Sequence, residues 1–375
     1  MKIVYITEFP IPSPAANCVH SLKTCEALAE HGVEVVMLVP QVDQPAEVDW
    51  PALLSDFDMS RAYRIIRLPA KMPGDRVYRF AWHCGREVAR QKPDVVYTIS
   101  PICGYFASRA GCEVVYEAHE VVQGRIKSWC LARLMSPRTC RHLVTISEAL
   151  KLRYTELYGI EQQRILVSHS AGDPIPVAAA TASAGAVPVK VGYAGSLGES
   201  EAAGRGVDII IQLAAALPEL EFHLLGGRPG EVRFWRQRAQ SPNISFHGHM
   251  TFTALKERLR DMDILLAPYQ GQVYISGGAN TASYMSPMKV FEYMAQGKAM
   301  VASDLPVLRE VLRHEENALL CPPQDVGAWC DAVKQLSEDE SFRSRLGATA
   351  LQDFQANYTW SIRGRRILEH VADSA

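Results

Sequence analysis

The sequence predicts an α/β protein made of two Rossmann-like halves, each built on a parallel sheet. Short runs of apolar and β-branched residues alternate with longer amphipathic segments along its 375 residues. This alternation is typical of βαβ units, whose strands are parallel. The pattern breaks once, between Pro174 and Pro188, where the segment PIPVAAATASAGAVP carries no charge. The chain is also longer than one ordinary domain and suits two of moderate size.

In the first half, residues 1–173, expected strands and helices follow each other in order. β-Branched and apolar runs predict strands at residues 3–7, 34–39, 65–68, 94–100, 113–117, 142–146 and 165–168. Apolar residues at helical spacing predict helices at residues 19–30, 76–90, 126–135 and 147–158. The last of these begins with Ser147 and Glu148, an N-cap residue and an early acid that suits the helix dipole.

Residues 174–188 are predicted to be a linker, because they are rich in Ala, Pro, Ser and Gly. A second domain, residues 189–357, then has expected strands at 189–194, 221–225, 244–247, 264–268, 299–303 and 318–321. A final Arg-rich helix, about 358–375, is expected to pack back on the first domain. Two such domains predict sheets that face each other across a cleft. In doubly wound sheets the ligand lies at the carboxyl ends of the strands.

Composition excludes several classes of protein. The net charge is −2, so no global field favours nucleic acid, and we expect no nucleic-acid partner. The nine cysteines form no CxxC pair and no zinc spacing, which indicates reduced thiols. The sequence shows no signal-peptide pattern and no apolar run near the ~20 residues of a membrane span. A cytoplasmic location is therefore expected.

The most informative segment is SPMKVFEYMAQGKAMVASD at residues 286–304. Ser286 is expected as an N-cap, with proline in the first helical turn and Gly297 just past the helix end. The free N–H groups and dipole of such a helix start suit a diphosphate. Lys289 and Glu292 lie three residues apart, on one side of the helix. They fit a phosphate-binding lysine and a ribose-binding carboxylate, or an ordinary surface ion pair.

This segment resembles the nucleotide-sugar site of retaining GT-B glycosyltransferases, above all glycosyltransferase family 4 (glycosyl transferases group 1). That family has a P-x-K-x-x-E-x-M-A-x-G-like segment before a buried strand. Further similarities follow in family order along the chain, at VYEAH (115–119), TISEAL (145–150), VGYAG (191–195), GRGVD (204–208), FHLLGG (222–227) and DILLAPY (263–269).

The resemblance implies a hexosyltransferase-type glycosyltransferase (EC 2.4). Such an enzyme moves a sugar from a nucleotide-diphosphate sugar, most often a UDP- or GDP-sugar, to an acceptor hydroxyl with retention of anomeric configuration. The acceptor would be a sugar, glycolipid or glycan, as in polysaccharide biosynthesis. No cofactor is expected. No metal is expected either, because the sequence has no Asp-x-Asp motif at a strand end.

The resemblance also implies roles for single donor-site residues. Glu292 matches the ribose-binding glutamate of the family's E-x7-E motif, whereas Tyr284 stands where the first glutamate belongs. Arg205 takes the place of a phosphate-binding lysine, and guanidinium chelates phosphate well. A second family cation would fall near Ser196, and Lys289 is expected to supply that charge instead.

Two loops and one histidine complete the implied site. His119 matches the family histidine at the reacting centre. Gly277 and Gly278 lie in a small polar loop that either cradles the sugar or diphosphate through its N–H groups or is only a linker. In the first β–α loop, Ala15 and Ala16 stand where the family has two glycines. Asn17 follows them and either donates to a phosphate or caps the next helix.

Residues 125–141 (RIKSWCLARLMSPRTCR), from Arg125 to Arg141, mix many cations with Trp129 and contain no acid. Such a segment fits a peripheral contact with an anionic membrane, at the inner face, or a helix whose apolar side is core. Three other functions stay open: a GT-B-like nucleotide-sugar epimerase, an accessory subunit that has lost turnover, and a phosphorylase. An epimerase would need acid–base carboxylates around the sugar, and Tyr284 stands where one is expected.

Overall fold

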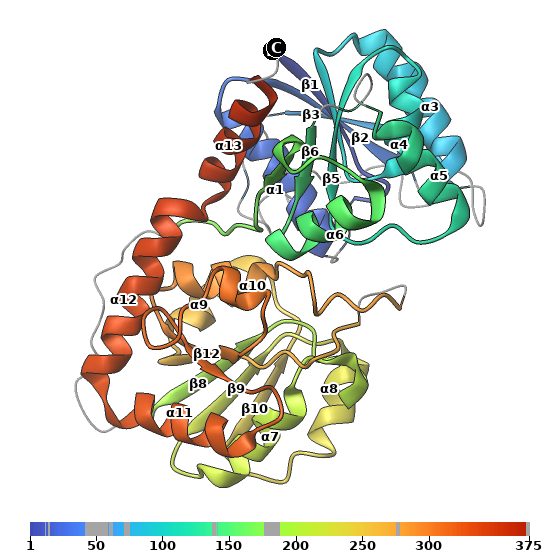
Figure 1. Cartoon of the computed structure of the whole chain (residues 1–375). Coiled ribbons are helices and arrows are strands. Elements are labelled where there is room, and N and C mark those ends of the chain that lie inside the picture. The colour runs from blue at the N-terminus through green and yellow to red at the C-terminus, as the bar shows by residue number, and fades with distance from the viewer. Residues whose placement is uncertain are drawn as a thin grey trace. The chain divides into compact units, whose positions relative to one another are not determined.

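The computed structural model in Figure 1 divides the chain into two compact units. It describes residues 1–11, 13, 16–41, 59, 63–70, 76–136, 140, 142–175, 188–274 and 278–372. The first unit is Met1–Ser170 with Trp360–Ala375, and the second is Ala171–Thr359. Residues 176–187 of the expected linker lie outside the described residues. Both units are α/β and each has one parallel sheet, which confirms the predicted fold class.

The sheet of the first unit has seven strands in the order β3-β2-β1-β4-β5-β6-β7. Their bounds are β1 Lys2–Ile6, β2 Glu34–Gln41, β3 Arg64–Pro69, β4 Val95–Thr98, β5 Glu113–Ala118, β6 His142–Thr145 and β7 Ile165–Val167. The central strands are buried along almost their whole length. Strands covered on both faces read as continuous apolar runs, which is why the sequence revealed them.

Six α-helices and one short 3-10 helix belong to the described part of this unit. Their bounds are α1 Ala16–Glu30, α3 Arg76–Gln91, α4 Pro101–Ser108, α5 Arg125–Leu134, α6 Glu148–Tyr158, η1 Gln162–Arg164 and α13 Trp360–Ala372. Helix α4 was not expected. It begins where the Ser100 hydroxyl accepts the N–H of Cys103, with Pro101 in its first turn. Helix α1 starts at Ala16, earlier than predicted, so Asn17 lies inside the first turn and does not precede the helix.

The C-terminal helix α13 packs against α1, as Figure 1 shows. A Cβ added at Gly364 would lie 3.0 Å from backbone and side-chain atoms of Ala27, so the two helices approach closely because Gly364 has no side chain. This approach brings Arg363 into the first unit, where its side chain is buried.

The second unit has a six-stranded parallel sheet in the order β10-β9-β8-β11-β12-β13. Its strands are β8 Lys190–Ala194, β9 Glu221–Leu225, β10 Ile244–Gly248, β11 Ile264–Ala267, β12 Ala299–Ser303 and β13 Leu319–Cys321. Its helices are η2 Glu201–Ala203, α7 Val207–Ala216, α8 Pro229–Arg236, α9 Phe252–Arg260, α10 Met288–Ala295, η3 Leu308–Glu310, α11 Val326–Glu338 and α12 Glu340–Asn357. Residues 171–173 group with this unit, because Gly172 pairs with Thr359 and its N–H donates to the Tyr358 carbonyl at 3.0 Å.

Strand order reverses once in each sheet, between β1 and β4 and between β8 and β11. In doubly wound sheets, ligands bind outside the carboxyl ends of the strands at such a switch point. Each unit therefore has its own candidate binding edge.

The start of α10 corrects one prediction. The helix begins at Met288, and its N-cap is Pro287 (φ −73°, ψ 121°), not Ser286. Pro287 is extended here, so it lies before the helix and not in its first turn. The predicted helix end is confirmed, since Gly297 follows Gln296 with φ +64°. In the part of the chain that the structure describes, no helix has the length and apolarity that a membrane crossing requires.

Candidate active site

In the second unit, Lys289 reaches from α10 to the switch point between β8 and β11. Its ammonium Nζ lies 3.6 Å from the ring centroid of Tyr193 and 5.2 Å from that of Tyr269. A Cβ added at Gly195 would lie 3.4 Å from the same nitrogen. Because glycine has no side chain, the ammonium lies next to the Gly195 backbone. Aromatic faces attract a cation, and the two tyrosines hold the lysine at the carboxyl edge of the sheet.

Neighbouring strands fix this arrangement. Tyr193 is the second-last residue of β8, and its hydroxyl donates to the Ser196 carbonyl at 2.7 Å. Tyr269 follows β11, which pairs directly with β8. The Tyr293 hydroxyl of α10 accepts the N–H of Ala194 at 2.7 Å. Helix α10 is thereby fastened to the end of β8, and Lys289 is aimed by the same attachment.

Arg205 lies in the same neighbourhood, between two glycines whose geometry no other residue suits. Gly204 has φ +72° and Gly206 has φ +70°. An added Cβ would lie 1.7 Å from the Gln272 carbonyl oxygen at Gly204, and 1.8 Å from that of Pro268 at Gly206. The Arg205 guanidinium donates to the Tyr274 carbonyl at 3.2 Å. The motif G-R-G therefore serves to present the arginine beside the 268–274 loop.

Burial and neighbouring charges shift the pKa values of Lys289 and Glu292 at this edge. Burial, followed by the charge of Arg205, lowers the pKa of Lys289 well below its ordinary value. Burial, followed by the charge of Asp173, raises the pKa of Glu292 to about 7, against the opposing effects of Lys289 and Lys256. A bound anion would restore the proton affinity of Lys289, because opposite charge favours the ionised form.

The loop after β8 is held by a carboxylate that the sequence reading missed. Glu231 is buried and accepts from the Ser196 hydroxyl at 3.1 Å and from the Leu197 N–H at 3.0 Å. The Trp235 indole N–H donates to the Leu197 carbonyl at 3.1 Å. Ser196, where a second family cation was expected, thus belongs to a fixed turn. In the sequence, the feature that could have revealed this contact is Glu231, the third residue of the segment PGEVRFW.

The remaining donor-site residues lie in or next to the loop that precedes α10. The Asn280 side-chain oxygen accepts the N–H groups of Val273 and Ala282, at 3.0 and 3.1 Å, and closes the loop. Gly278 is exposed there with φ +81°, and Gly277 lies outside the described residues. Tyr284 is buried and Ser286 is partly buried. The structure therefore places Lys289, Arg205 and Glu292 within electrostatic reach of one another, with Gly278, Tyr284 and Ser286 in the adjoining segment.

In the first unit, His119 stands at the carboxyl end of β5 beside the buried carboxylate of Glu117. The two atoms His119 Nε2 and Glu117 Oε1 are 2.8 Å apart. His20 Nε2 from α1 lies at the same distance from that oxygen. The Arg363 guanidinium from α13 donates to it at 2.5 Å, and the Tyr97 hydroxyl donates to the other oxygen. His119 stands out in the sequence within VYEAH (115–119), but no local pattern points to Arg363.

The ligand atoms of His20, Glu117 and His119 lie within 4.8 Å of one another, a spacing that suits a metal ion. The donor set does not fit one. The Glu117 oxygen that both histidines approach already accepts from Arg363, and a fixed guanidinium beside a bound cation is repulsive. We therefore read this cluster as a hydrogen-bonded network.

The start of the first β–α loop is only partly described. Ala15 lies outside the described residues, Ala16 is the exposed first residue of α1, and Asn17 is partly buried. At the same edge, the Glu8 carboxylate accepts from the Ser100 hydroxyl at 2.6 Å and lies 3.6 Å from the Lys127 ammonium. Glu8, which no sequence motif marks, thus joins the ends of β1 and β4 to α5.

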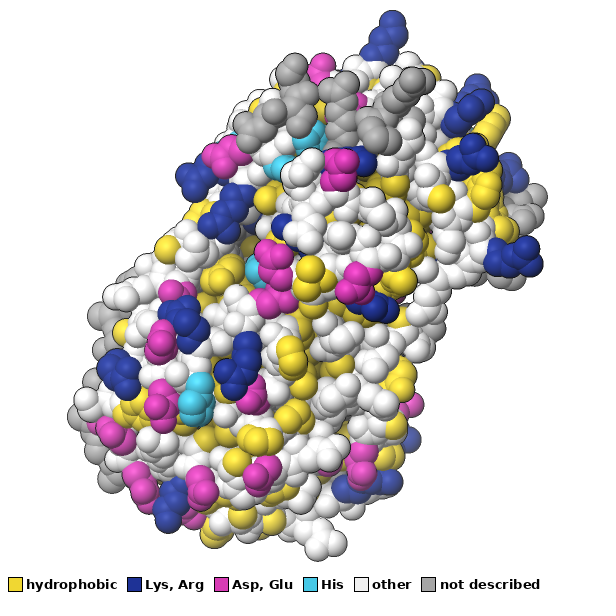
Figure 2. Space-filling view, in the orientation of Figure 1, with side chains coloured by type: hydrophobic (Ala, Val, Ile, Leu, Met, Phe, Trp, Pro, Cys, Tyr) yellow, Lys and Arg dark blue, Asp and Glu magenta, His cyan; other side chains and the backbone are white. Residues whose placement is uncertain are grey.

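One surface of the first unit combines exposed aromatic and basic side chains. Trp82 on α3 and Trp129 on α5 are 48% and 49% exposed. Arg86 and Arg133 lie over their rings, at 4.9 and 5.5 Å from the centroids. Figure 2 shows hydrophobic and Lys/Arg side chains side by side along the edge where Figure 1 draws α3 to α5. We call Trp82, Arg86, Trp129 and Arg133 the aromatic–basic face.

The segment predicted to contact a membrane, residues 125–141, has side chains both on the aromatic–basic face and in the core. Leu131 and Leu134 of α5 are buried, as is Met135, whereas Ile126 is 55% exposed. Residues 137–139 and 141 lie outside the described residues. One side of α5 is therefore part of the core and the other side is exposed, and the membrane contact stays a prediction.

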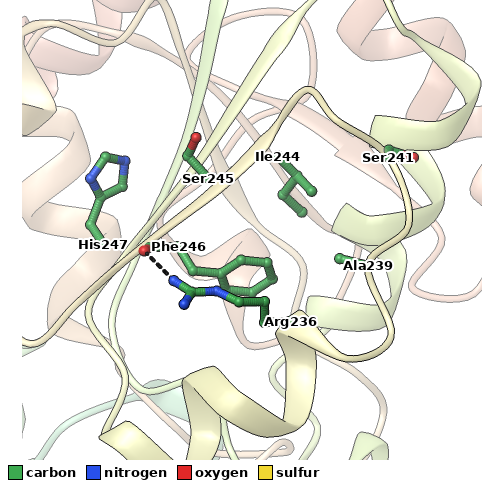
Figure 3. Close-up of a pocket in the computed structure, with 7 residues that line it drawn as sticks. All are labelled: Arg236, Ala239, Ser241, Ile244, Ser245, Phe246 and His247. Carbon is green, nitrogen blue, oxygen red and sulfur yellow. Dashed lines mark hydrogen bonds between the residues drawn. The ribbon is translucent and has the colours of Figure 1, made fainter.

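A shallow groove runs beside the outer strand β10 of the second unit (Figure 3). It is lined by Arg236, Ala239, Ser241, Ile244, Ser245, Phe246 and His247. The Arg236 guanidinium donates to the Phe246 carbonyl at 3.2 Å. This contact satisfies a carbonyl of the edge strand β10 that could otherwise pair with another strand. We therefore assign the groove to protection of the sheet edge and not to ligand binding.

Two protein-family models match successive parts of the chain. The family described as Glycosyltransferase Family 4 matches residues 19–174. The family described as Glycosyl transferases group 1 matches residues 162–339.

Among curated proteins, the chain is similar to the phosphatidyl-myo-inositol mannosyltransferase of Mycolicibacterium smegmatis. The two are 25% identical over 177 residues, which are 46% of this chain and 42% of the mannosyltransferase. The match thus spans less than half of that relative's length.

Among solved structures, the chain is similar to HepE from Anabaena in complex with UDP. The TM-score is 0.73 at 14% identity, and 100% of both chains is covered. Sucrose-phosphate synthase from Thermosynechococcus elongatus gives a TM-score of 0.75 at 16% identity, over 99% of this chain and 98% of that one. These likenesses show the fold, with both Rossmann-like units included. With family models of glycosyltransferases that match residues 19–174 and 162–339, the chain is similar over most of its length to glycosyltransferases of the GT-B fold.

Proposed function

We propose that this protein transfers a sugar from a nucleotide-diphosphate sugar to an acceptor hydroxyl, with retention of anomeric configuration. The observation that carries the proposal is the pair of cations, Lys289 and Arg205, at the switch point of the second unit. One cation is desolvated and both lie beside glycine backbone. A diphosphate is the ligand that would balance these charges.

Relatives support the choice of donor. Crystal structures of HepE hold UDP and UDP-glucose. A UDP-sugar is therefore the first donor to test here, with a GDP-sugar as the second. In the proposed site Glu292 accepts from the ribose hydroxyls, and Lys289 and Arg205 bind the diphosphate.

The proposed mechanism of sugar transfer follows from the charge that develops on the leaving diphosphate. As the bond between the sugar and the diphosphate breaks, negative charge grows on the leaving phosphate, and fixed cations stabilise it. An acceptor hydroxyl attacks the anomeric carbon from the face that the diphosphate leaves. A leaving phosphate oxygen takes the hydroxyl proton, so the step needs neither a protein base nor a resident metal. The product would belong to a glycan, polysaccharide or glycolipid.

A thermal-shift screen tests the donor site. We expect UDP or GDP, or one of their sugar conjugates, to raise the melting temperature by about 5–10 °C at a hundredfold excess over Kd. Glu292→Ala should abolish the rise, because it removes the carboxylate that holds the ribose. Glu219→Ala, which removes an exposed carboxylate of the same unit, should leave it unchanged.

The pH dependence of binding is a second arm of this test. Because the pKa of Glu292 is raised to about 7, the carboxylate takes up a proton as the pH falls through that value. Ribose hydroxyls donate to the ionised form, so UDP-glucose should bind more weakly below about pH 7. Glu292→Gln should remove this dependence. If no nucleotide shifts a well-folded sample, the protein is an accessory subunit that has lost turnover.

We also propose a peripheral contact between the aromatic–basic face and an anionic membrane, at the cytoplasmic side where the nine free cysteines stay reduced. Exposed tryptophans with arginines above them suit the headgroup layer. Trp82→Ser with Trp129→Ser should reduce flotation with vesicles of phosphatidylglycerol and phosphatidylcholine by roughly tenfold. The matched control is Leu152→Ser with Leu157→Ser on α6, which removes equally exposed apolar side chains, 50% and 49%. Equal flotation of the two variants would contradict the proposal.

A further inference from the structure

We propose that Glu117 and Arg363 are positioning residues that fix the tautomer of His119, so that its ring presents Nδ1 as a hydrogen-bond acceptor. The group that meets this nitrogen would be a hydroxyl of a sugar. This inference deepens the proposed function and rests on it for the identity of the substrate. The hydrogen-bond pattern itself rests on the first unit alone.

The charge on Glu117 determines which hydrogen bonds it can make. This carboxylate is fully buried, and burial alone would raise its pKa. The charge of Arg363, followed by His20 and His119, outweighs that effect and holds the pKa well below its ordinary value. Arg363 is itself buried and its own pKa is raised by Glu117. Glu117 is therefore ionised, and an ionised carboxylate only accepts hydrogen bonds.

An acceptor on one side of a histidine fixes where its proton lies. His119 Nε2 is 2.8 Å from Glu117 Oε1, so this nitrogen must carry the hydrogen. In a neutral imidazole the other nitrogen then has a free lone pair. The His119 side chain is 20% exposed, and among the described residues no partner of Nδ1 is found. The ring therefore offers an acceptor at the carboxyl end of β5.

His20 also contacts both Glu117 and the ring of His119. Its Nε2 also lies 2.8 Å from Glu117 Oε1, and its ring meets that of His119 edge-on at a centroid distance of 4.5 Å. Burial lowers the pKa of His20 to about 4, so it is neutral near pH 7 and donates its one N–H to Glu117. The carboxylate is thus held by donors from α1, β4 and α13, and His119 has little freedom to turn.

This arrangement gives the C-terminal helix a part in the reaction. Arg363 reaches Glu117 across 246 positions of sequence, and its Nε also donates to the His169 carbonyl at 3.1 Å. A hydroxyl can donate to the bare Nδ1, whereas a carboxylate or phosphate offers no hydrogen there and would face a buried anion behind the ring. The site therefore favours a sugar hydroxyl at this point over an acidic group.

Nitrogen-15 NMR of histidine-labelled protein, full length and without ligand, tests the tautomer directly. At pH 8 we expect the wild-type His119 ring to carry its hydrogen on Nε2 and to show Nδ1 as the bare nitrogen. A wild-type ring protonated on Nδ1 would overturn the proposal, whatever happens to any variant.

Two matched double variants then test the consequence for the reaction. Glu117→Gln/Arg363→Met removes both buried charges but keeps an acceptor oxygen at position 117. Glu117→Leu/Arg363→Met removes the acceptor as well. We expect the Gln variant to keep the Nε2–H tautomer, and the Leu variant to show a mixture of tautomers. Relative to the Gln variant, kcat of the Leu variant should be roughly tenfold to hundredfold lower, with KM for the nucleotide sugar little changed.

Equal kcat values in the two double variants would overturn the positioning role. The thermal shift with UDP, which depends on the second unit, should persist in both. Its absence in wild-type protein would count against the proposed function, and the NMR result would still decide the tautomer.

Discussion

Replacing Lys289 by methionine should lower kcat by roughly 10²–10³ and, in the same protein, raise thermal stability. The first effect follows because the ammonium stabilises charge on the leaving diphosphate. The gain in stability follows because burial lowers the pKa of Lys289 well below its ordinary value. The unfolded chain therefore binds a proton that the folded protein holds weakly. That difference destabilises the folded state most at pH values below the lowered pKa, and it fades as the pH rises towards the ordinary value.

The measurement pairs kinetics with calorimetry across pH. Lys289→Met should melt at a higher temperature than wild type near pH 7, and the difference should shrink at alkaline pH. Lys190→Met is the matched control, because Lys190 is the first residue of β8, at the opposite end of the strand from Lys289. It should alter neither kcat nor the slope of stability against pH. Loss of stability without loss of kcat would mean that Lys289 is a structural cation and not a ligand for phosphate.

Sequence patterns were sufficient for the sheets but not for every helix. Strands such as β1 and β12 are buried on both faces, so each appears as an unbroken apolar run. Helix α4 is also buried on most sides, since α3 and α5 pack on it. Its sequence PICGYFAS consequently shows no polar face, and the 3.6-residue period that reveals a surface helix is missing.

The candidate site was predictable where one segment carried the signal. Lys289 and Glu292 share one helix, and Arg205 stands between two glycines that mark a special backbone. Their partners come from elsewhere. Tyr193 and Tyr269 meet Lys289 only because β8 and β11 are neighbours in the sheet. Contacts of this kind depend on strand order, which no local pattern of residues contains.

The N-cap prediction at Ser286 failed for a local reason. Serine before proline is a common helix start, with the proline in the first turn. Here Pro287 keeps an extended ψ of 121°, so the helix begins one residue later. Helix ends are the least certain feature that propensity alone can supply.

Arg363→Met should be the most destabilising single change in the first unit. It leaves the fully buried Glu117 without its cation, and breaking a buried ion pair in this way costs about 3–5 kcal/mol. For a unit of this size, that corresponds to a fall of roughly 10 °C in melting temperature. Differential scanning calorimetry should show the fall in the transition of the first unit, with the second unit's transition unchanged.

The double variant Glu117→Gln/Arg363→Met should recover most of this loss, because no buried charge then lacks a partner. The pair Arg363 and Glu117 lies at 3% and 0% side-chain exposure, so solvent cannot screen the remaining charge in the single variant. A double-mutant cycle separates the interaction from the two side chains. A coupling energy near zero would mean that water reaches Glu117 once Arg363 is gone. A large one would mean that Arg363 of the C-terminal helix stabilises the first unit by neutralising the carboxylate beside His119.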